Sequence, residues 1–163
     1  HSKVRKVEKM ALHIVLVEPE IPHNTGSIAR TCAVTGAVLH LIRPLGFSTD
    51  DRYLKRAGLD YWKYVDIRYY DSFSELVAHY PSHRFFCATT KAKKFYTDFQ
   101  YKDEDFFVFG KETKGLPPEI LQQFQETCIR VPLLPDKRSL NLSQSVGIII
   151  YEALRQLDFP NMI

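Results

Sequence analysis

The sequence has no long hydrophobic run and hardly any net charge beyond its first residues. No apolar stretch approaches the roughly 18 residues that a membrane-spanning helix needs, and the longest, at 146–151, is followed by Glu152. Residues 1–9 hold four basic side chains and one acid, so the net charge of +3 comes from them, and 18 basic residues balance 18 acidic ones in the remainder. We therefore expect no membrane partner, and any nucleic acid must be bound by a local basic patch.

Cysteine is scarce and unpaired. Cys32, Cys87 and Cys128 are the three cysteines, they lie far apart, and no C-x-x-C pair occurs. An odd, scattered set favours reduced, buried thiols in a cytoplasmic protein over a disulfide framework. Because Met10 and the apolar run after it have the pattern of a native start, residues 1–9 are interpreted as a foreign leader or flexible tail, and 10–163 as a single domain.

Common nucleotide-binding and metal-binding motifs are also missing. The seven glycines form no G-x-G, P-loop or G-x-S-x-G pattern, which argues against Rossmann-type cofactor sites, P-loop NTPases and hydrolases with a nucleophile elbow. His79 and His83 have helical spacing, but Pro81 lies between them. His13 and His40 fall in strand patterns and are interpreted as structural residues. We therefore expect no metal site.

Strand and helix patterns alternate along the chain. Short apolar runs predict strands at 12–17, 38–42, 65–69, 85–89, 106–109 and 129–131. Caps, prolines and apolar stripes predict helices at 25–36, capped by Asn24, and at 50–58, 73–77, 117–124 and 146–157. This alternation predicts an α/β fold, a mostly parallel sheet with helices on both faces. Ligands of such sheets bind at the carboxyl ends of the strands.

Three segments carry positive signals. The small residues of 24–31, NTGSIART, allow close approach of a ligand or partner, and Arg30 has a fork suited to phosphate. The segment 109–117, FGKETKGLP, has glycines that leave backbone N–H groups open to a ligand. The segment 131–143, VPLLPDKRSLNLS, is an apolar, proline-stiffened loop that can enclose a flat ring and ends in polar side chains at a helix start.

In this order and spacing, the three segments resemble the three motifs of the SPOUT class of S-adenosylmethionine-dependent RNA methyltransferases. The sequence is most similar to small single-domain members that methylate the ribose 2′-oxygen of the wobble nucleotide of tRNA, a cytidine or modified uridine at position 34. The resemblance covers Met10 to about Pro160, and includes IVLVEPEIPHNTG at 14–26 and KRAGLDY at 55–61.

The resemblance implies both the fold and the cofactor. In this family the C-terminal part is threaded into a deep trefoil knot, which general connectivity rules treat as a rare exception. S-adenosylmethionine is held in the knot by three loops, mostly through backbone groups, with leucines as apolar walls. The cofactor-binding residues implied here are Ala88, Thr89, Gly110, Glu112, Val131, Leu133, Ser139 and Leu140.

The catalytic residues implied by the resemblance are Arg30, Asn24, Ser139 and Asn141. Because the methyl group on a sulfonium is already activated, the protein must align the reactants and help a ribose hydroxyl lose its proton. Arginine stays protonated in proteins, so we expect Arg30 to stabilise a developing alkoxide or bind the adjacent phosphate rather than act as a base. Ser139 and Asn141 would orient the ribose or cofactor, and Glu112 would fix its loop or pair with a basic neighbour.

The expected partners are the anticodon stem-loop of tRNA and a second copy of the chain. Basic residues interleave with aromatic ones at 52–68, and further basic residues flank the cofactor loops. The expected RNA-binding residues are Arg52, Lys55, Arg56, Lys137 and Arg138. The homodimer is expected because Arg30 lies far in sequence from the cofactor loops and could complete the site across a two-fold interface formed by the first-motif and final helices.

Three alternatives stay open at this point. Ribosomal RNA could be the substrate of an enzyme of the same class. The chain could be a non-catalytic knotted RNA-binding module, although the intact set of candidate catalytic residues argues against it. A flavodoxin-like nucleotide binder would share the α/β alternation, but the sequence has no flavin or P-loop signature.

Overall fold

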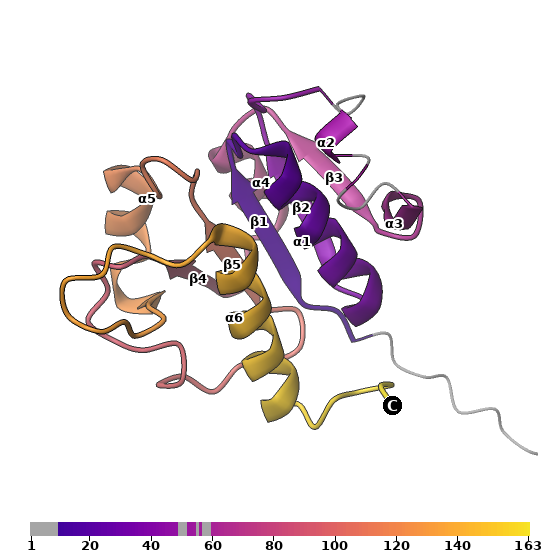
Figure 1. Cartoon of the computed structure of the whole chain (residues 1–163). Helices are drawn as coiled ribbons and strands as arrows, with labels where there is room; N and C mark the ends of the chain where they lie inside the picture. The colour runs from indigo at the N-terminus through magenta and orange to yellow at the C-terminus, as the bar shows by residue number, and fades with distance from the viewer. Residues whose placement is uncertain (1–9, 49–51, 55, 57–59) are drawn as a thin grey trace, which may run out of the picture.

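The computed structural model describes residues 10–48, 52–54, 56 and 60–163 (Figure 1). The expected leader at 1–9 and the candidate RNA-binding residue Lys55 lie outside the described residues. Most of the helix expected at 50–58 lies outside them too, and its described part includes the short helix α2 (Arg52–Leu54).

The described residues form one six-stranded parallel sheet, which confirms the predicted fold class. Its strands are β1 (His13–Val17), β2 (Val38–Ile42), β3 (Ile67–Tyr70), β4 (Phe85–Ala88), β5 (Phe106–Phe109) and β6 (Cys128–Ile129). Their order in the sheet is β3-β2-β1-β5-β4-β6. From β1 the chain adds β2 and β3 on one side of the sheet, and then places β4, β5 and β6 on the other side of β1. The strand order therefore reverses between β1 and β5, and such a switch point is where sheets of this kind bind ligands.

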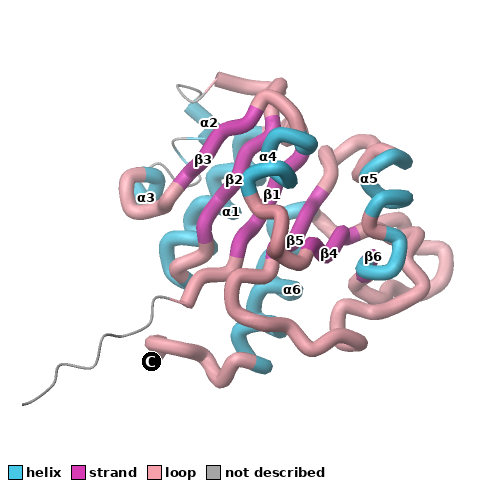
Figure 2. The backbone as a smooth tube through the Cα atoms, turned by 180° about the vertical axis from the view of Figure 1, so that it is seen from behind, coloured by secondary structure: helices cyan, strands magenta, loops and turns pink. Residues whose placement is uncertain are grey.

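Helices cover both faces of the sheet, as predicted. Helices α1 (Pro22–Thr35) and α6 (Leu142–Gln156) lie side by side on one face (Figure 1). Helices α4 (Phe73–His79) and α5 (Pro118–Gln123) lie on the other, as the view from behind shows (Figure 2). The short helix α3 (Asp60–Trp62) contacts α1, and a single 3₁₀ turn, η2 (Gln125–Thr127), follows α5. No helix in this described part of the chain is long and apolar enough to cross a bilayer.

Alternation along the strands divides the core into two layers. Ile14 and Leu16 of β1 pack in the cluster that contains the buried residues of α1 and α6. Val15 and Val17 of the same strand pack in the second cluster, with residues of α4 and α5. Because all five residues of β1 are buried, its sequence reads as a continuous apolar run rather than an alternating one.

Most predicted elements are present, with one informative correction. Strands β2 and β5 have the predicted bounds, and Gly36 ends α1 in the left-handed conformation with φ of 79°. However, α1 begins at Pro22, with Ile21 as its N-cap, so the prediction that Asn24 caps this helix was wrong. Proline at the first helical position has the required φ and lacks an N–H that would need a partner, so the helix can start before Asn24.

Candidate functional site

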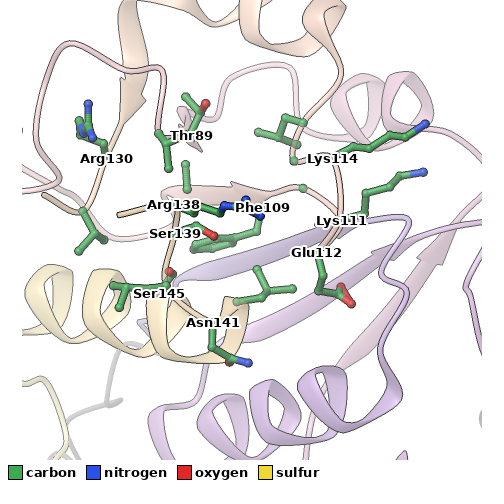
Figure 3. Close-up of a pocket in the computed structure, with 18 of the residues that line it drawn as sticks. Thr89, Phe109, Lys111, Glu112, Lys114, Arg130, Arg138, Ser139, Asn141 and Ser145 are labelled. Atoms are coloured by element: carbon green, nitrogen blue, oxygen red, sulfur yellow. The ribbon is translucent and has the colours of Figure 1, made fainter. Parts of the chain in front are cut away.

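A hollow of about 540 Å³ opens at the carboxyl ends of β4, β5 and β6. Its walls come from three loops that lie far apart in the sequence, together with the start of α6 (Figure 3). Asn24 of α1 also lines it. The volume lies within the roughly 300–1,000 Å³ range of small-molecule sites. All eight residues that the family resemblance implies for cofactor binding line this hollow, namely Ala88, Thr89, Gly110, Glu112, Val131, Leu133, Ser139 and Leu140.

The loop 110–115 forms one wall and is closed on itself. The N–H of Gly115 donates to the carbonyl of Lys111 at 2.9 Å, and Gly115 has a φ of 68°, which favours glycine. A Cβ on Gly110 would lie 2.1 Å from the carbonyl carbon of Gly115, closer than any real contact. Glycine at 110 is therefore required by the loop's own return path, and not only by the approach of a ligand.

The remaining walls combine apolar side chains with fixed backbone. Ile129, Val131, Leu133 and Leu140 line the hollow from β6 and the loop after it. Beside Ile129, to whose carbonyl the N–H of Thr89 donates, the hydroxyl of Thr89 accepts the N–H of Lys91 at 3.1 Å, which holds the turn after β4. Such walls can enclose a flat, partly apolar molecule while backbone groups supply its polar contacts.

Two asparagines join the first and third sequence motifs. The amide nitrogen of Asn141 donates to Oδ1 of Asn24 at 3.1 Å, across 117 positions of sequence. Asn141 also caps α6, because its Oδ1 accepts the N–H of Ser143 at 2.9 Å. Asn24 is buried, and its side chain makes this bridge instead of the predicted capping bond. Ser139 lies next to the bridge on the wall of the hollow and is exposed.

Arg30 does not line the hollow of its own chain. It is exposed on α1, and its guanidinium carbon lies 4.9 Å from the centre of the Tyr61 ring, a cation–π arrangement. Three of the four candidate catalytic residues thus meet at the hollow, namely Asn24, Ser139 and Asn141, whereas Arg30 stands apart.

The rim of the hollow is basic. Among the described residues, Lys91, Lys114 and Arg138 make no ion pair, whereas Lys111 lies 3.8 Å from a carboxylate oxygen of Glu18. Lys111 and Lys114 extend outward on the same side, away from Ser139 (Figure 3). Because these cations surround an open site, they can attract an anionic ligand such as a nucleic acid.

The other expected RNA-binding residues lie apart from the hollow. Arg52, Arg56 and Lys137 are exposed, but only Arg138 of the expected set also lines the hollow. Of the aromatic residues near Arg52, Tyr64 is exposed and Trp62 packs against the core. No group of three metal-ligating side chains is found within residues 10–48, 52–54, 56 and 60–163.

Glu112 lines the hollow, but its carboxylate is engaged with α1. It accepts the N–H of Ile21 at 2.5 Å and the N–H of Glu20 at 3.2 Å. Glu20, which sequence reasoning missed, accepts the hydroxyl of Thr113 at 2.7 Å and its N–H at 3.1 Å. These two hydrogen bonds hold the pKa of the Glu20 carboxyl below its usual range. No local sequence signal marked Glu20, because its partner Thr113 lies 93 positions away in the chain.

The histidines expected to be structural lie in a buried network at the opposite end of β1. Nδ1 of His13 lies 2.9 Å from Nε2 of His40, and Nε2 of His13 lies 2.6 Å from a Glu104 oxygen. Burial lowers the pKa of both imidazoles, that of His40 to about 3. None of these residues lines the hollow, so the network contributes to the fold and not to the site.

Comparison with known proteins gives consistent matches over nearly the whole chain. Residues 11–151 match the SpoU rRNA Methylase family. A protein of Escherichia coli strain K12 named tRNA (cytidine(34)-2'-O)-methyltransferase is 48% identical over 154 residues, covering 93% of this chain and 98% of that protein. A Geobacillus stearothermophilus protein, provisionally given the same name, is 53% identical over 156 residues, covering 94% and 99%.

A solved structure gives the same result in three dimensions. It comes from work on 2-OH methylation of C/U34 on tRNA, and it superimposes with a TM-score of 0.88 at 43% identity, covering 92% of this chain and 98% of that one. These matches confirm the resemblance carried by the three sequence segments, and the chain belongs to the SpoU methylase family.

Proposed function

We propose that the protein transfers a methyl group from S-adenosylmethionine to the ribose 2′-oxygen of the wobble nucleotide of tRNA, a cytidine or modified uridine at position 34. The observation that carries the proposal is the three-loop hollow, because it gathers all the cofactor-binding residues implied by the sequence at the carboxyl ends of β4, β5 and β6. Relatives at 48% and 53% identity, whose names specify 2′-O-methylation of cytidine 34 of tRNA, and the solved structure from work on C/U34 support the substrate.

The residues of the hollow fit S-adenosylmethionine. The apolar walls of Val131, Leu133 and Leu140 suit an adenine ring, and the loops at 88–91 and 110–115 offer backbone groups to its polar atoms. Arg130 also lines the hollow, and within the described residues its Nε is buried without a hydrogen-bond partner. A buried donor without an acceptor is costly, so this Nε is suited to a ligand atom or water that comes close enough to accept from it.

The chain's own residues would align the reactants and handle the charge that develops on the ribose oxygen. The bound cofactor supplies a methyl group already activated on sulfur. Asn141, fixed by its bond to Asn24, and Ser139 present polar groups that orient the ribose. Arg30 would stabilise the developing alkoxide or hold the neighbouring phosphate through its planar fork.

The protein is proposed to act as a homodimer, because Arg30 lies outside the hollow of its own chain. The outer surfaces of α1 and α6 expose Val34 (54%), Ile148 (36%) and Tyr151 (42%), side chains that a second copy could cover. A two-fold interface along these helices would place Arg30 of each copy near the partner's hollow and complete the catalytic set.

Substrate RNA would approach over the basic rim. Lys91, Lys114 and Arg138 surround the hollow, and Arg52, Arg56 and Lys137 supply further exposed cations, so the anticodon stem-loop could be held through its phosphates. We infer further that the family's trefoil knot forms in the C-terminal part of one methyltransferase domain at 10–163. We place this enzyme in the cytoplasm, where its unpaired cysteines would stay reduced.

The decisive experiment is mass mapping of ribose methylation in total tRNA. The purified protein is incubated with S-adenosylmethionine and tRNA from cells that lack the corresponding gene, and the anticodon fragments are analysed. A methyl group on the ribose of nucleotide 34 is the expected result. Methylation of ribosomal RNA alone would favour the alternative substrate, and methylation of neither RNA would indicate the non-catalytic binding module.

A further inference from the structure

Two glutamates link the loops that follow β1 and β5, at the switch point of the sheet. Glu112 accepts the N–H groups of Glu20 and Ile21, and Glu20 accepts the hydroxyl and the N–H of Thr113. Each glutamate therefore binds the segment that carries the other, and we call this arrangement the glutamate clasp. The distances from Glu112 are 3.2 and 2.5 Å, and those from Glu20 are 2.7 and 3.1 Å.

The clasp replaces the cap that α1 lacks. Ile21, the N-cap residue, makes no side-chain capping bond, and no acidic residue stands in the first turn of α1. The first N–H groups of a helix have no partner within it, and its positive end favours a nearby carboxylate. Glu112, from a different loop, supplies that carboxylate. The start of α1 is thus tied to the wall of the hollow rather than to its own sequence.

The clasp also connects two walls of the hollow to each other through α1. The loop 110–115 is closed by the bond from Gly115 to Lys111 and has no room for a Cβ at Gly110. The clasp joins this loop to the start of α1, and the bond between Asn24 and Asn141 joins α1 to the wall before α6. A displacement of α1 would therefore break contacts with two walls of the hollow.

We propose that Glu20 and Thr113 are positioning residues for methyl transfer, acting together with Glu112 through the clasp. They hold α1, with Asn24 and Arg30, in a fixed position relative to the cofactor loops. This inference rests on the proposed function. Glu20 accepts its two hydrogen bonds from Thr113, and the Glu112 carboxylate accepts from the segment that begins α1. Because these groups bind each other's segments, we expect the clasp to affect turnover by positioning α1 and not to affect cofactor affinity.

The test uses variants that remove one or both of the hydrogen bonds between Glu20 and Thr113. Thr113→Val removes the hydroxyl at nearly constant volume, Thr113→Ser keeps it, and Glu20→Ala removes the acceptor. Glu20→Gln retains an oxygen that can accept both Thr113 bonds. Glu119→Gln, which changes an exposed glutamate in the first turn of α5, is the matched control for loss of charge. Affinity for S-adenosylhomocysteine, melting temperature and single-turnover methylation at saturating tRNA are measured on the same samples.

We expect Thr113→Val and Glu20→Ala to cut single-turnover methylation by about 10- to 100-fold, the effect of a displacement of about 1 Å in an active site. Affinity for S-adenosylhomocysteine should change less than about twofold, and Thr113→Ser, Glu20→Gln and Glu119→Gln should stay near the parent rate. The double variant of Glu20→Ala and Thr113→Val should lose little beyond Glu20→Ala alone, because that variant already removes the acceptor of both Thr113 bonds.

Two results would overturn the proposal that the clasp positions residues for methyl transfer. One is near-parent turnover in folded Thr113→Val and Glu20→Ala proteins. The other is a loss of turnover that only follows the folded fraction, which would make the clasp a purely structural contact. If instead the unaltered protein methylates no tRNA, the proposed function fails, and that outcome is read from the parent protein before any variant is compared.

Discussion

Gly110 occupies a position where the backbone leaves no space for a side chain. Gly110→Val would push its Cβ against the Gly115 carbonyl carbon, 2.1 Å away, and force the loop open. Overpacking of this kind costs about 1–3 kcal/mol, which corresponds to about 5- to 150-fold in affinity for S-adenosylhomocysteine if it falls on the bound state. Gly147→Ala in α6 is the matched control, because a Cβ there meets nothing within 4 Å. Calorimetry showing parent affinity in Gly110→Val would contradict the placement of the cofactor.

Arg30 is proposed to act in methyl transfer, although it lies outside the hollow of its own chain. Arg30→Ala should leave affinity for S-adenosylhomocysteine nearly unchanged while single-turnover methylation falls by about 10²–10³-fold, the typical effect of losing one preorganised electrostatic donor. Arg30→Lys should recover little, since a point charge cannot replace a planar fork.

The Arg30 test needs a control for the cation–π contact with Tyr61, 4.9 Å away. Tyr61→Leu removes this contact and keeps the guanidinium, so it should retain most of the activity. A folded Arg30→Ala protein with near-parent turnover would remove Arg30 from the mechanism. Equal losses in Arg30→Ala and Tyr61→Leu would assign Arg30 a structural role.

The start of α6 has two roles that substitution can separate. Asn141 caps the helix through Ser143 and also donates to Asn24. Asn141→Ala should lose both, with about 1 kcal/mol of stability from the cap. Asn141→Ser should retain the cap but not the bridge. We expect both variants to lose methylation activity, and only the alanine variant to lose stability in urea unfolding. Parent activity in Asn141→Ser would show that the bridge to α1 is dispensable.

The sequence pattern predicted some elements better than others. It was accurate where an element depends on its own residues and failed where a distant residue sets the boundary. Strands β2 and β5 were predicted to the residue because each is a buried apolar run between clear breaks. The start of α1 was misplaced because its cap is a carboxylate from residue 112, which no local pattern can show. Glu20 was missed for the same reason, since its partner Thr113 lies 93 positions away.

The buried histidine pair makes the stability of the whole molecule depend on pH. Burial lowers the pKa of His13 and His40, so the unfolded chain binds more protons than the folded one below the ordinary histidine pKa of about 6.5. Stability is therefore complete above about pH 6.5 and is lost as the pH falls, by up to about 1.4 kcal/mol per pH unit for each histidine, and the contribution of His40 continues to be lost down to about pH 3.

Urea unfolding between pH 7 and 5 measures this dependence. His40→Asn should flatten the slope by about one histidine's contribution, whatever its effect on absolute stability. Replacement of the exposed His23 by Asn is the control. An unchanged slope in His40→Asn would show that His40 is protonated alike in the folded and unfolded chains.

Assembly of two copies is testable by sedimentation. The proposed dimer has twice the 19.0 kDa mass of the chain. Val34→Glu and Tyr151→Glu should shift it towards the monomer, because a charge would be buried in an apolar contact, and methylation should fall with the dimer fraction. Gln123→Glu, an exposed change on α5, should have no effect. A monomeric parent protein with full activity would refute the shared site.

The order of apolar runs, caps and breaks was enough to predict a parallel α/β sheet with helices on both faces, because each strand and helix carries its own local pattern. The three segments, with the stretches at 14–26 and 55–61, were enough to indicate the family, and that resemblance implied the eight cofactor-binding residues that line the hollow. Tertiary structure alone decided which of these residues meet. It joined Asn24 to Asn141, tied Glu112 and Glu20 across the switch point, and left Arg30 outside its own hollow. The physical reason is that strand order in a sheet is settled by packing between distant segments, and neighbouring strands such as β1 and β5 bring together loops that no local sequence pattern relates.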